Sequence, residues 1–185
     1  WTRIPVIFRP FHEHTGSWFW WGRGNTSAVD YRILWQFTVD YLKDEKGLHN
    51  LLYAYSTDVF SSREDYLEFY PGDDYVDVIA YDDYHSIRTR ETLPELGRQL
   101  REIVSLAREK GKVAALSETG LESIPIEDWF TGYLLAGIRQ DPQTHGIAYV
   151  LVWRNANKKH HYGPYEGHPC TADFIRFYED PYTLF

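Results

Sequence analysis

The segment Val76-Asp77-Val78-Ile79-Ala80-Tyr81-Asp82-Asp83-Tyr84 is a short apolar run that ends in acidic and polar residues. A nearly continuous apolar run of this length is typical of a parallel strand that is covered on both faces of its sheet. Four further segments have the same pattern, namely residues 5–11, 51–55, 113–116 and 147–152. We therefore predict five parallel strands, the third of which covers residues 76–81.

Helical patterns lie between the predicted strands. Residues 27–43 carry an apolar residue at every fourth position, which is typical of one side of a helix: Val29, Ile33, Phe37 and Tyr41. Further helices are predicted over residues 93–110, 126–139 and about 171–178, with one or two helical turns in residues 63–70.

Three signals mark the ends of these helices. Ser27 and Asp30 form a possible cap pair at the start of the first helix, and Thr92 and Glu95 have capping-box spacing. Gly111 is expected to end the helix over residues 93–110, because glycine readily adopts the left-handed conformation of a helix C-terminus.

Alternating strands and helices, with no internal repeat or linker, predict a single α/β unit. Two arrangements fit five parallel strands: an open doubly wound sheet, or part of a (β/α)8 TIM barrel. The glycine-rich phosphate loops of nucleotide-binding open sheets are missing from the sequence. Candidate reactive residues follow four or five successive strands, and barrel active sites lie at the carboxyl ends of the strands. We therefore predict the barrel.

The length of the chain bears on how much of a barrel it holds. The 185 residues are few for a complete barrel, which needs about 250, and the first apolar run begins almost at residue 1. We expect residues 1–185 to be the C-terminal part of one catalytic barrel, approximately strands four to eight. Strands one to three are expected upstream in the same polypeptide or in a separate segment, because an isolated arc would expose two sheet edges.

The composition bears on the kind of partner. The net charge is −8 and no basic stripe is visible, so nucleic acid is not expected as a partner. No apolar run approaches the roughly 18 residues of a membrane-spanning helix, and no signal peptide is visible. The single cysteine, Cys170, cannot form an internal disulfide. Aromatic residues make up 17% of the chain, and Trp and Tyr suit sugar surfaces as well as a core.

Two glutamates follow apolar runs at distant positions of the chain, Glu13 and Glu118. A barrel brings the ends of its strands together over one opening. Cleavage of a glycosidic bond needs two carboxyl groups, one to protonate the leaving oxygen and one to attack the anomeric carbon or activate water. A single glutamate at a strand end is more often a solvated loop residue, so the interpretation as a glycosidase depends on the surroundings of the two.

The sequence around the first glutamate is Arg9-Pro10-Phe11-His12-Glu13-His14-Thr15-Gly16-Ser17-Trp18-Phe19-Trp20-Trp21-Gly22. It resembles the acid/base segment of glycoside hydrolase family 26, the β-mannanase family in the large clan of retaining barrel glycosidases. The resemblance implies that Glu13 is the acid/base at the end of strand four, that His12 belongs to the active centre, and that Trp18 lies near the point of cleavage.

Three other strand ends extend the resemblance along the chain. Ser117-Glu118-Thr119-Gly120 resembles the family's strand seven, which makes Glu118 the expected nucleophile. Asp82-Asp83-Tyr84 resembles a D-x-Y pattern after strand six, which implies that Tyr84 hydrogen-bonds the nucleophile and that Asp82 helps to bind a sugar. Trp153-Arg154 resembles the W-R pair of strand eight, in which the Trp stacks on the reacting sugar and the Arg acts with the strand-six Asp at the next subsite.

The resemblance implies endo-β-1,4-mannanase activity on mannan, galactomannan or glucomannan, by double displacement with retained configuration. Mixed-linkage β-glucan and β-1,3-xylan are alternative substrates, because enzymes of the same family act on them. No cofactor is expected, since two carboxylates suffice for the reaction. A polymeric substrate implies an extracellular, periplasmic or cell-surface location.

The chemistry sets further expectations for the site. Burial and the charge of Glu118 should raise the pKa of Glu13. The two carboxyl groups should lie about 5–5.5 Å apart, as retention requires. Asp82 and Arg154 are expected to form a charge-assisted pair or an ordinary salt bridge, and Arg9 is expected to stabilise the mouth of the barrel from within.

Two rival interpretations use the same residues. His12 and His14 have the H-x-H spacing of metal-dependent barrel hydrolases, but the later strand ends do not carry the His, Lys and Asp residues that such sites need. If both histidines pointed inward, Glu13 would point away from the site. The second rival is a catalytically inactive carbohydrate-binding barrel, which would keep aromatic platforms but would have no need of both glutamates with their partners. We therefore favour a catalytic site.

Overall fold

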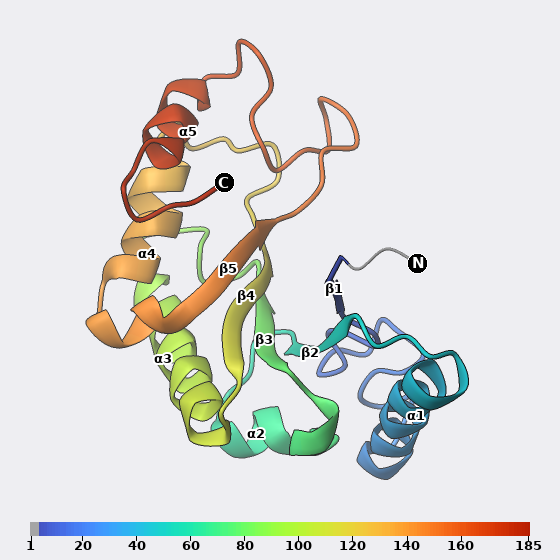
Figure 1. The fold of residues 1–185 in the computed structure, drawn as a ribbon. Coiled ribbons are helices and arrows are strands. Elements are labelled where there is room, and N and C mark those ends of the chain that lie inside the picture. The colour runs from blue at the N-terminus through green and yellow to red at the C-terminus, as the bar shows by residue number, and fades with distance from the viewer. Residues whose placement is uncertain (1–3) are drawn as a thin grey trace.

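The computed structural model describes residues 4–185 and contains one sheet of five parallel strands in the order β1-β2-β3-β4-β5. The strands form an arc with β1 and β5 at its two edges (Figure 1). Their bounds are Val6–Phe8 for β1, Leu51–Thr57 for β2, Val78–Asp83 for β3, Val113–Thr119 for β4 and Ile147–Val152 for β5. All five predicted strands are present and pair in parallel.

A helix follows each strand along the chain. The bounds are Ala28–Asp40 for α1, Arg63–Leu67 for α2, Leu93–Lys110 for α3, Ala136–Arg139 for α4 and Thr171–Tyr178 for α5. π-helical turns extend α1 over Tyr41–Glu45 and precede α4 over Phe130–Leu135, and 3₁₀ helices cover Asp73–Tyr75 and Pro142–Gly146. Within residues 4–185, no helix combines the length and the apolar character needed to cross a membrane.

The two faces of the sheet are packed differently. The outer face and the helices form the main core, which contains large buried side chains such as Trp35, Ile79 and Leu100. The inner face carries mainly small side chains: Ala54, Val78, Ala80 and Ala115, against which Tyr149 packs. Small side chains leave room on the concave side of a curved sheet, where space is limited.

The inner face becomes polar at the carboxyl ends of the strands. Side chains alternate between the faces of a strand, so Ser56, Asp82 and Ser117, each two positions after an inner alanine, also face inward. The register of β3 and β4 shifts after Tyr81, so that Asp82 pairs with Glu118 rather than with Ser117. This bulge adds one residue to β4 and brings both Ser117 and Glu118 to the inner end of the strand.

The first helix, α1, does not bury the face whose apolar residues predicted the helix. Its buried residues are Tyr31, Trp35 and Val39, and the Trp35 indole donates a hydrogen bond to the carbonyl of Tyr75 at 3.0 Å. The apolar residues at every fourth position are exposed instead: Val29, Ile33, Phe37 and Tyr41. Because the helix has apolar residues on both sides, its periodicity predicts that it forms but not which face it buries.

Two of the three predicted helix-end signals are confirmed. The Ser27 hydroxyl accepts a hydrogen bond from the backbone N–H of Asp30 at 3.1 Å, and Gly111 ends α3 with φ 65°. The capping box of Thr92 and Glu95 is wrong. Thr92 itself has helical backbone angles, so its hydroxyl donates to carbonyls of the preceding loop and does not cap the helix.

Candidate active site

Glu13 lies beyond the end of β1, on a turn with unusual backbone angles. The strand ends at Phe8, earlier than predicted, and Phe11 and Glu13 have φ angles of 49° and 53°. Positive φ angles are unfavourable for residues with a Cβ and cluster at functional sites. The Glu13 backbone N–H donates to the Ser56 carbonyl at 3.0 Å, and the Glu13 carboxylate accepts from the Trp18 indole at 2.9 Å. The turn therefore holds this side chain in one orientation.

Glu118, the second-last residue of β4, accepts hydrogen bonds at both of its carboxylate oxygens. The Tyr84 hydroxyl donates to Oε2 at 2.9 Å, which is the predicted hydrogen bond. The Arg9 guanidinium donates to Oε1 and forms an ion pair with it. Only 4% of Glu118 is exposed, so two donors hold its charge in a nearly closed environment.

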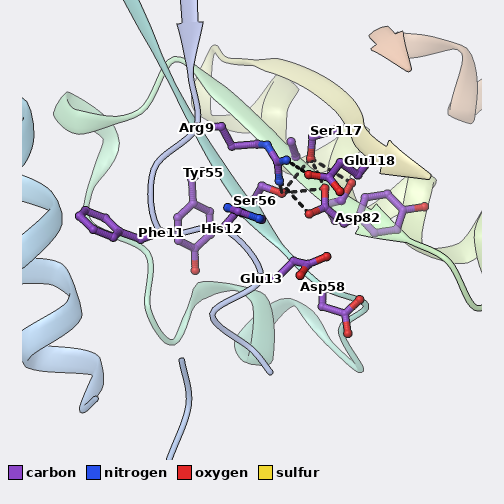
Figure 2. A network of polar contacts seen from close by, with 12 residues as sticks. Arg9, Phe11, His12, Glu13, Tyr55, Ser56, Asp58, Asp82, Ser117 and Glu118 are labelled. Carbon is purple, nitrogen blue, oxygen red and sulfur yellow. Dashed lines mark hydrogen bonds and ion pairs between the residues drawn. The ribbon is translucent and has the colours of Figure 1, made fainter. Parts of the chain in front are cut away.

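Three carboxylates, from Glu13, Asp82 and Glu118, converge from three parts of the chain (Figure 2). Each presents an oxygen within 4.8 Å of an oxygen of the other two. The nearest carboxylate oxygens of Glu13 and Glu118 therefore lie within 4.8 Å of each other. Among residues 4–185, this is also the one group with the spacing of a metal site, and Arg9 supplies positive charge to two of its members.

The surroundings set the protonation states of the side chains that face the site. Burial raises the pKa of Glu13, as predicted, and the hydrogen bond from Trp18 opposes the rise. The negative charge that adds to the rise is that of Asp58, whereas the prediction named Glu118. Asp58 follows β2 and was not singled out in the sequence (Figure 2). Burial and the charge of Arg9 lower the pKa of His12 to about 4, so His12 is neutral near pH 7.

Asp82 is paired with Arg9 and not with Arg154. Arg9 donates to Oδ2 at 2.8 Å, and the hydroxyls of Ser56 and Ser117 bind Oδ1 at 3.0 and 2.7 Å. Burial raises the pKa of Asp82 to about 7, and Arg9 and the Ser117 hydroxyl oppose this rise. The predicted Asp82–Arg154 pair is wrong, because Asp82 is 0% exposed whereas Arg154 is exposed beyond the end of β5. Their expected contacts with sugar stay predictions.

A cleft of about 560 Å³ lies beside the two glutamates. Five of the predicted site residues line it: the two glutamates themselves, with His12, Tyr84 and Trp153. Trp18 is not in the lining; 58% of it is exposed, and its indole binds Glu13. The sequence analysis did not single out the other lining residues, which are Phe19, Arg88, Gly120, Leu121, Glu122 and Tyr162. Phe19 and Gly120 lie within the quoted motifs, although no role was assigned to them, and the other four lie on loops that no quoted motif covers.

His14 lies in the core and not at the site. It is buried beside the rings of Tyr31, Tyr55 and Phe69, at centroid distances of 4.5, 4.9 and 5.0 Å. Its Nε2 is 2.9 Å from the Tyr55 hydroxyl. The metal-dependent interpretation requires both His12 and His14 to face the site. His12 lines the cleft whereas His14 is buried in the core, so the structure contradicts this requirement.

Replacing His14 with Phe is expected to change how stability depends on pH. Burial lowers the pKa of His14 to about 3 from 6.5. Between pH 3 and pH 6.5 the unfolded chain binds a proton at this residue that the folded chain does not. The free energy of unfolding therefore falls as the pH falls below 6.5, by up to about 1.4 kcal/mol per pH unit. Urea unfolding from about pH 7 to pH 5 should therefore show a shallower loss in His14→Phe than in the wild type. Equal slopes would contradict the neutral buried state of His14.

The sequence of this chain matches one known family and several known proteins. Residues 2–133 match the sequence profile described as glycosyl hydrolase family 26. A mannan endo-1,4-β-mannosidase of Bifidobacterium adolescentis is 46% identical over 125 residues, which are 64% of this chain and 12% of that protein. The mannan endo-1,4-β-mannosidase A and B of Caldalkalibacillus mannanilyticus is 32% identical over 164 residues, which are 85% of this chain and 29% of that protein.

The fold also matches solved structures. A β-mannanase of glycoside hydrolase family 26 from Bacteroides ovatus has a TM-score of 0.90 at 45% identity, over 98% of this chain and 52% of that chain. A double mutant of the endo-β-1,4-mannanase of Cellulomonas fimi has a TM-score of 0.92 at 42% identity, over 98% of this chain and 42% of that chain. The chain thus spans about half or less of the length of these relatives. The five-stranded arc is part of a (β/α)8 barrel, which confirms the predicted fold class.

Proposed function

This chain belongs to glycosyl hydrolase family 26, and from that premise we propose that it is the catalytic part of a retaining endo-β-1,4-mannanase. The observation that carries the proposal is the convergence of Glu13 and Glu118 within 4.8 Å of each other. Their surroundings suit opposite roles. Burial raises the pKa of Glu13, which favours a proton donor, whereas Arg9 and Tyr84 both donate to Glu118, which favours a charged nucleophile.

The two glutamates divide the reaction between them. Glu118 attacks the anomeric carbon while Glu13 protonates the departing glycosidic oxygen, which gives a covalent glycosyl-enzyme. The Glu13 carboxylate then removes a proton from water, and the water displaces Glu118 with retained configuration. Burial raises the pKa of Tyr84 above its ordinary value, so its hydroxyl keeps its proton and continues to orient Oε2 of Glu118.

A β-mannan is the proposed substrate. Four relatives described above carry mannan or mannanase in their names. Phe19, Trp153 and Tyr162 offer aromatic rings along the cleft, and such rings suit the apolar faces of sugars. A polymer of this kind is degraded where it occurs, so we place the enzyme outside the cytoplasm, as an extracellular, periplasmic or cell-surface protein.

Hydrolysis of four polysaccharides by the intact protein tests this function. Galactomannan and glucomannan should be cleaved much faster than lichenan and β-1,3-xylan, and the early products should have mixed lengths if the enzyme acts within chains. Proton NMR of the first products should show β-anomers before mutarotation. Preferential cleavage of lichenan or β-1,3-xylan would reassign the substrate, first products with the α-configuration would exclude retention, and no cleavage of any polysaccharide would contradict the enzymatic function.

A further inference from the structure

Arg9 joins two carboxylates that come from neighbouring strands. Its Nη1 donates to Asp82 at 2.8 Å, and its Nη2 donates to Glu118. Figure 2 shows the guanidinium beside both carboxylates, at the ends of β3 and β4. In the mechanism above Arg9 does not touch the substrate, so any influence on the reaction acts through Glu118.

Asp82 fixes one side of the guanidinium. It is 0% exposed, and its other oxygen binds Ser56 and Ser117, whose hydroxyls lie 2.8 Å apart. Ser56 also accepts from Arg9 at 3.3 Å. A guanidinium is planar and rigid, so the contacts of Nη1 determine where Nη2 lies. Asp82 therefore sets the position from which Arg9 reaches Glu118.

The cluster holds more acidic groups than basic ones. Three carboxylates, those of Glu13, Asp82 and Glu118, lie within 4.8 Å of one another, and Arg9 forms ion pairs with two of them. A buried carboxylate is costly unless a cation or donors compensate it. The negative charge of Glu118 therefore depends strongly on Arg9.

We propose that Arg9 and Asp82 form a positioning pair for the nucleophile, and that its main kinetic effect is to speed the release of the sugar from Glu118. This inference rests on the proposed glycosidase function. In the first step a Glu118 oxygen bonds to the anomeric carbon, the glycosidic C–O bond breaks, and Glu13 gives its proton to the departing oxygen. In the second step water attacks the same carbon, a water proton goes to Glu13, and the electron pair of the ester bond returns to Glu118.

Arg9 acts in opposite directions on the two steps. Its attraction to a full carboxylate weakens as the neutral ester forms, so its charge opposes the first step, although it keeps Glu118 ionised and aligned. The attraction returns as the ester breaks, because negative charge develops on the departing carboxylate. Arg9 therefore makes Glu118 a better leaving group in the second step.

An Arg9→Met variant of the intact protein tests the positioning pair. With 2,4-dinitrophenyl β-mannobioside, whose leaving group needs no proton, we expect a burst of one equivalent of dinitrophenolate and then a steady state about 10²-fold slower than in the wild type. KM should fall together with kcat, because the glycosyl-enzyme accumulates. The acidic limb of kcat/KM should move up by about one pH unit. Arg9→Lys should restore that limb but only part of the rate, since it keeps the charge and loses the fork.

Two further variants make the result decisive. Arg90 is an exposed arginine that forms an ion pair of 2.8 Å with Asp128, and it does not line the cleft. Arg90→Met should change neither the burst nor the acidic limb. If Arg9→Met does not fold, the double variant with Asp82→Asn removes the uncompensated buried charge and should show the same burst. A folded variant without Arg9 that shows no burst and an unchanged acidic limb overturns the proposal.

A measurement without turnover separates this inference from the proposed function. Carbon-13 NMR of labelled glutamate, assigned by comparison with Glu118→Gln, should show that Glu118 ionises at higher pH in Arg9→Met than in the wild type. If the wild type cleaves no glycan, the proposed function fails and the NMR titration still tests the pair. If the wild type is active and the titration of Glu118 does not move, the positioning role fails and the function stands.

Discussion

A Glu118→Gln variant is expected to hydrolyse β-mannan about 10⁴-fold more slowly than the wild type, or slower still. The amide has nearly the same shape as the carboxylate but lacks the negative charge that attacks the anomeric carbon. Arg9 and Tyr84 donate to the two carboxylate oxygens, and an amide nitrogen cannot accept either bond. The loss should extend to aryl mannosides, because a better leaving group does not replace the nucleophile.

Substrate binding should survive this change. Calorimetric titration with mannotetraose should give a Kd within about tenfold of the wild-type value, because only the attacking atom is altered. Glu109→Gln is a matched control, because this exposed carboxylate forms an ion pair of 2.7 Å with Arg63 and does not line the cleft. The variant should keep the wild-type kcat. Hydrolysis by Glu118→Gln at the wild-type rate would remove Glu118 from its assigned role.

The strands were predictable because burial on both faces of a sheet requires a nearly continuous apolar run. β5 matches its predicted bounds, whereas β3 and β4 continue beyond theirs to Asp83 and Thr119. The apolar pattern stops before the strand does, because residues with polar side chains still pair through their backbone at the carboxyl end of the strand. Asp82 and Glu118 are such a pair, so the chemistry begins within the last paired positions of the strands.

The buried face of α1 was less predictable, because it depends on distant partners. Residues on two sides of the helix are apolar, and only Tyr31, Trp35 and Val39 are buried. The deciding contact includes the carbonyl of Tyr75, which lies in a later connection of the chain. A local window of sequence contains no information about that partner.

The residues of the motifs were predictable from the sequence, but their ion pairs were not. Arg154 was expected to pair with Asp82, and Arg9 was expected only to support the mouth of the barrel. The bulge between β3 and β4 sets Asp82 level with Glu118, within reach of a single guanidinium from the end of β1. A bulge depends on how two strands pair, so no pattern within one strand could reveal it.

Glu13 has a second role in the proposed mechanism, and this role gives its variants a distinctive signature. As an acid it protonates the leaving oxygen, and as a base it activates water. Burial raises its pKa, with Asp58 adding to the rise and Trp18 opposing it. The proton is needed in the first step, so the wild-type kcat/KM on polysaccharide should fall as the pH rises through this raised value.

A Glu13→Ala variant should lose about 10²–10⁴-fold in kcat on β-mannan, because neither the departing oxygen nor the water is assisted. With 2,4-dinitrophenyl β-mannobioside the first step should persist without an alkaline limb, and the glycosyl-enzyme should accumulate. Azide needs no base, so it should restore turnover and yield a β-mannosyl azide, identified by NMR. Glu45→Ala, an exposed control at the end of the π-helical turn that follows α1, should behave as the wild type. When the Glu13 side chain is missing, azide can attack the glycosyl-enzyme from the side that Glu13 occupied, which gives the β-configured product. Undiminished cleavage of mannan by Glu13→Ala, or an α-configured azide product, would therefore assign the proton transfers to another group.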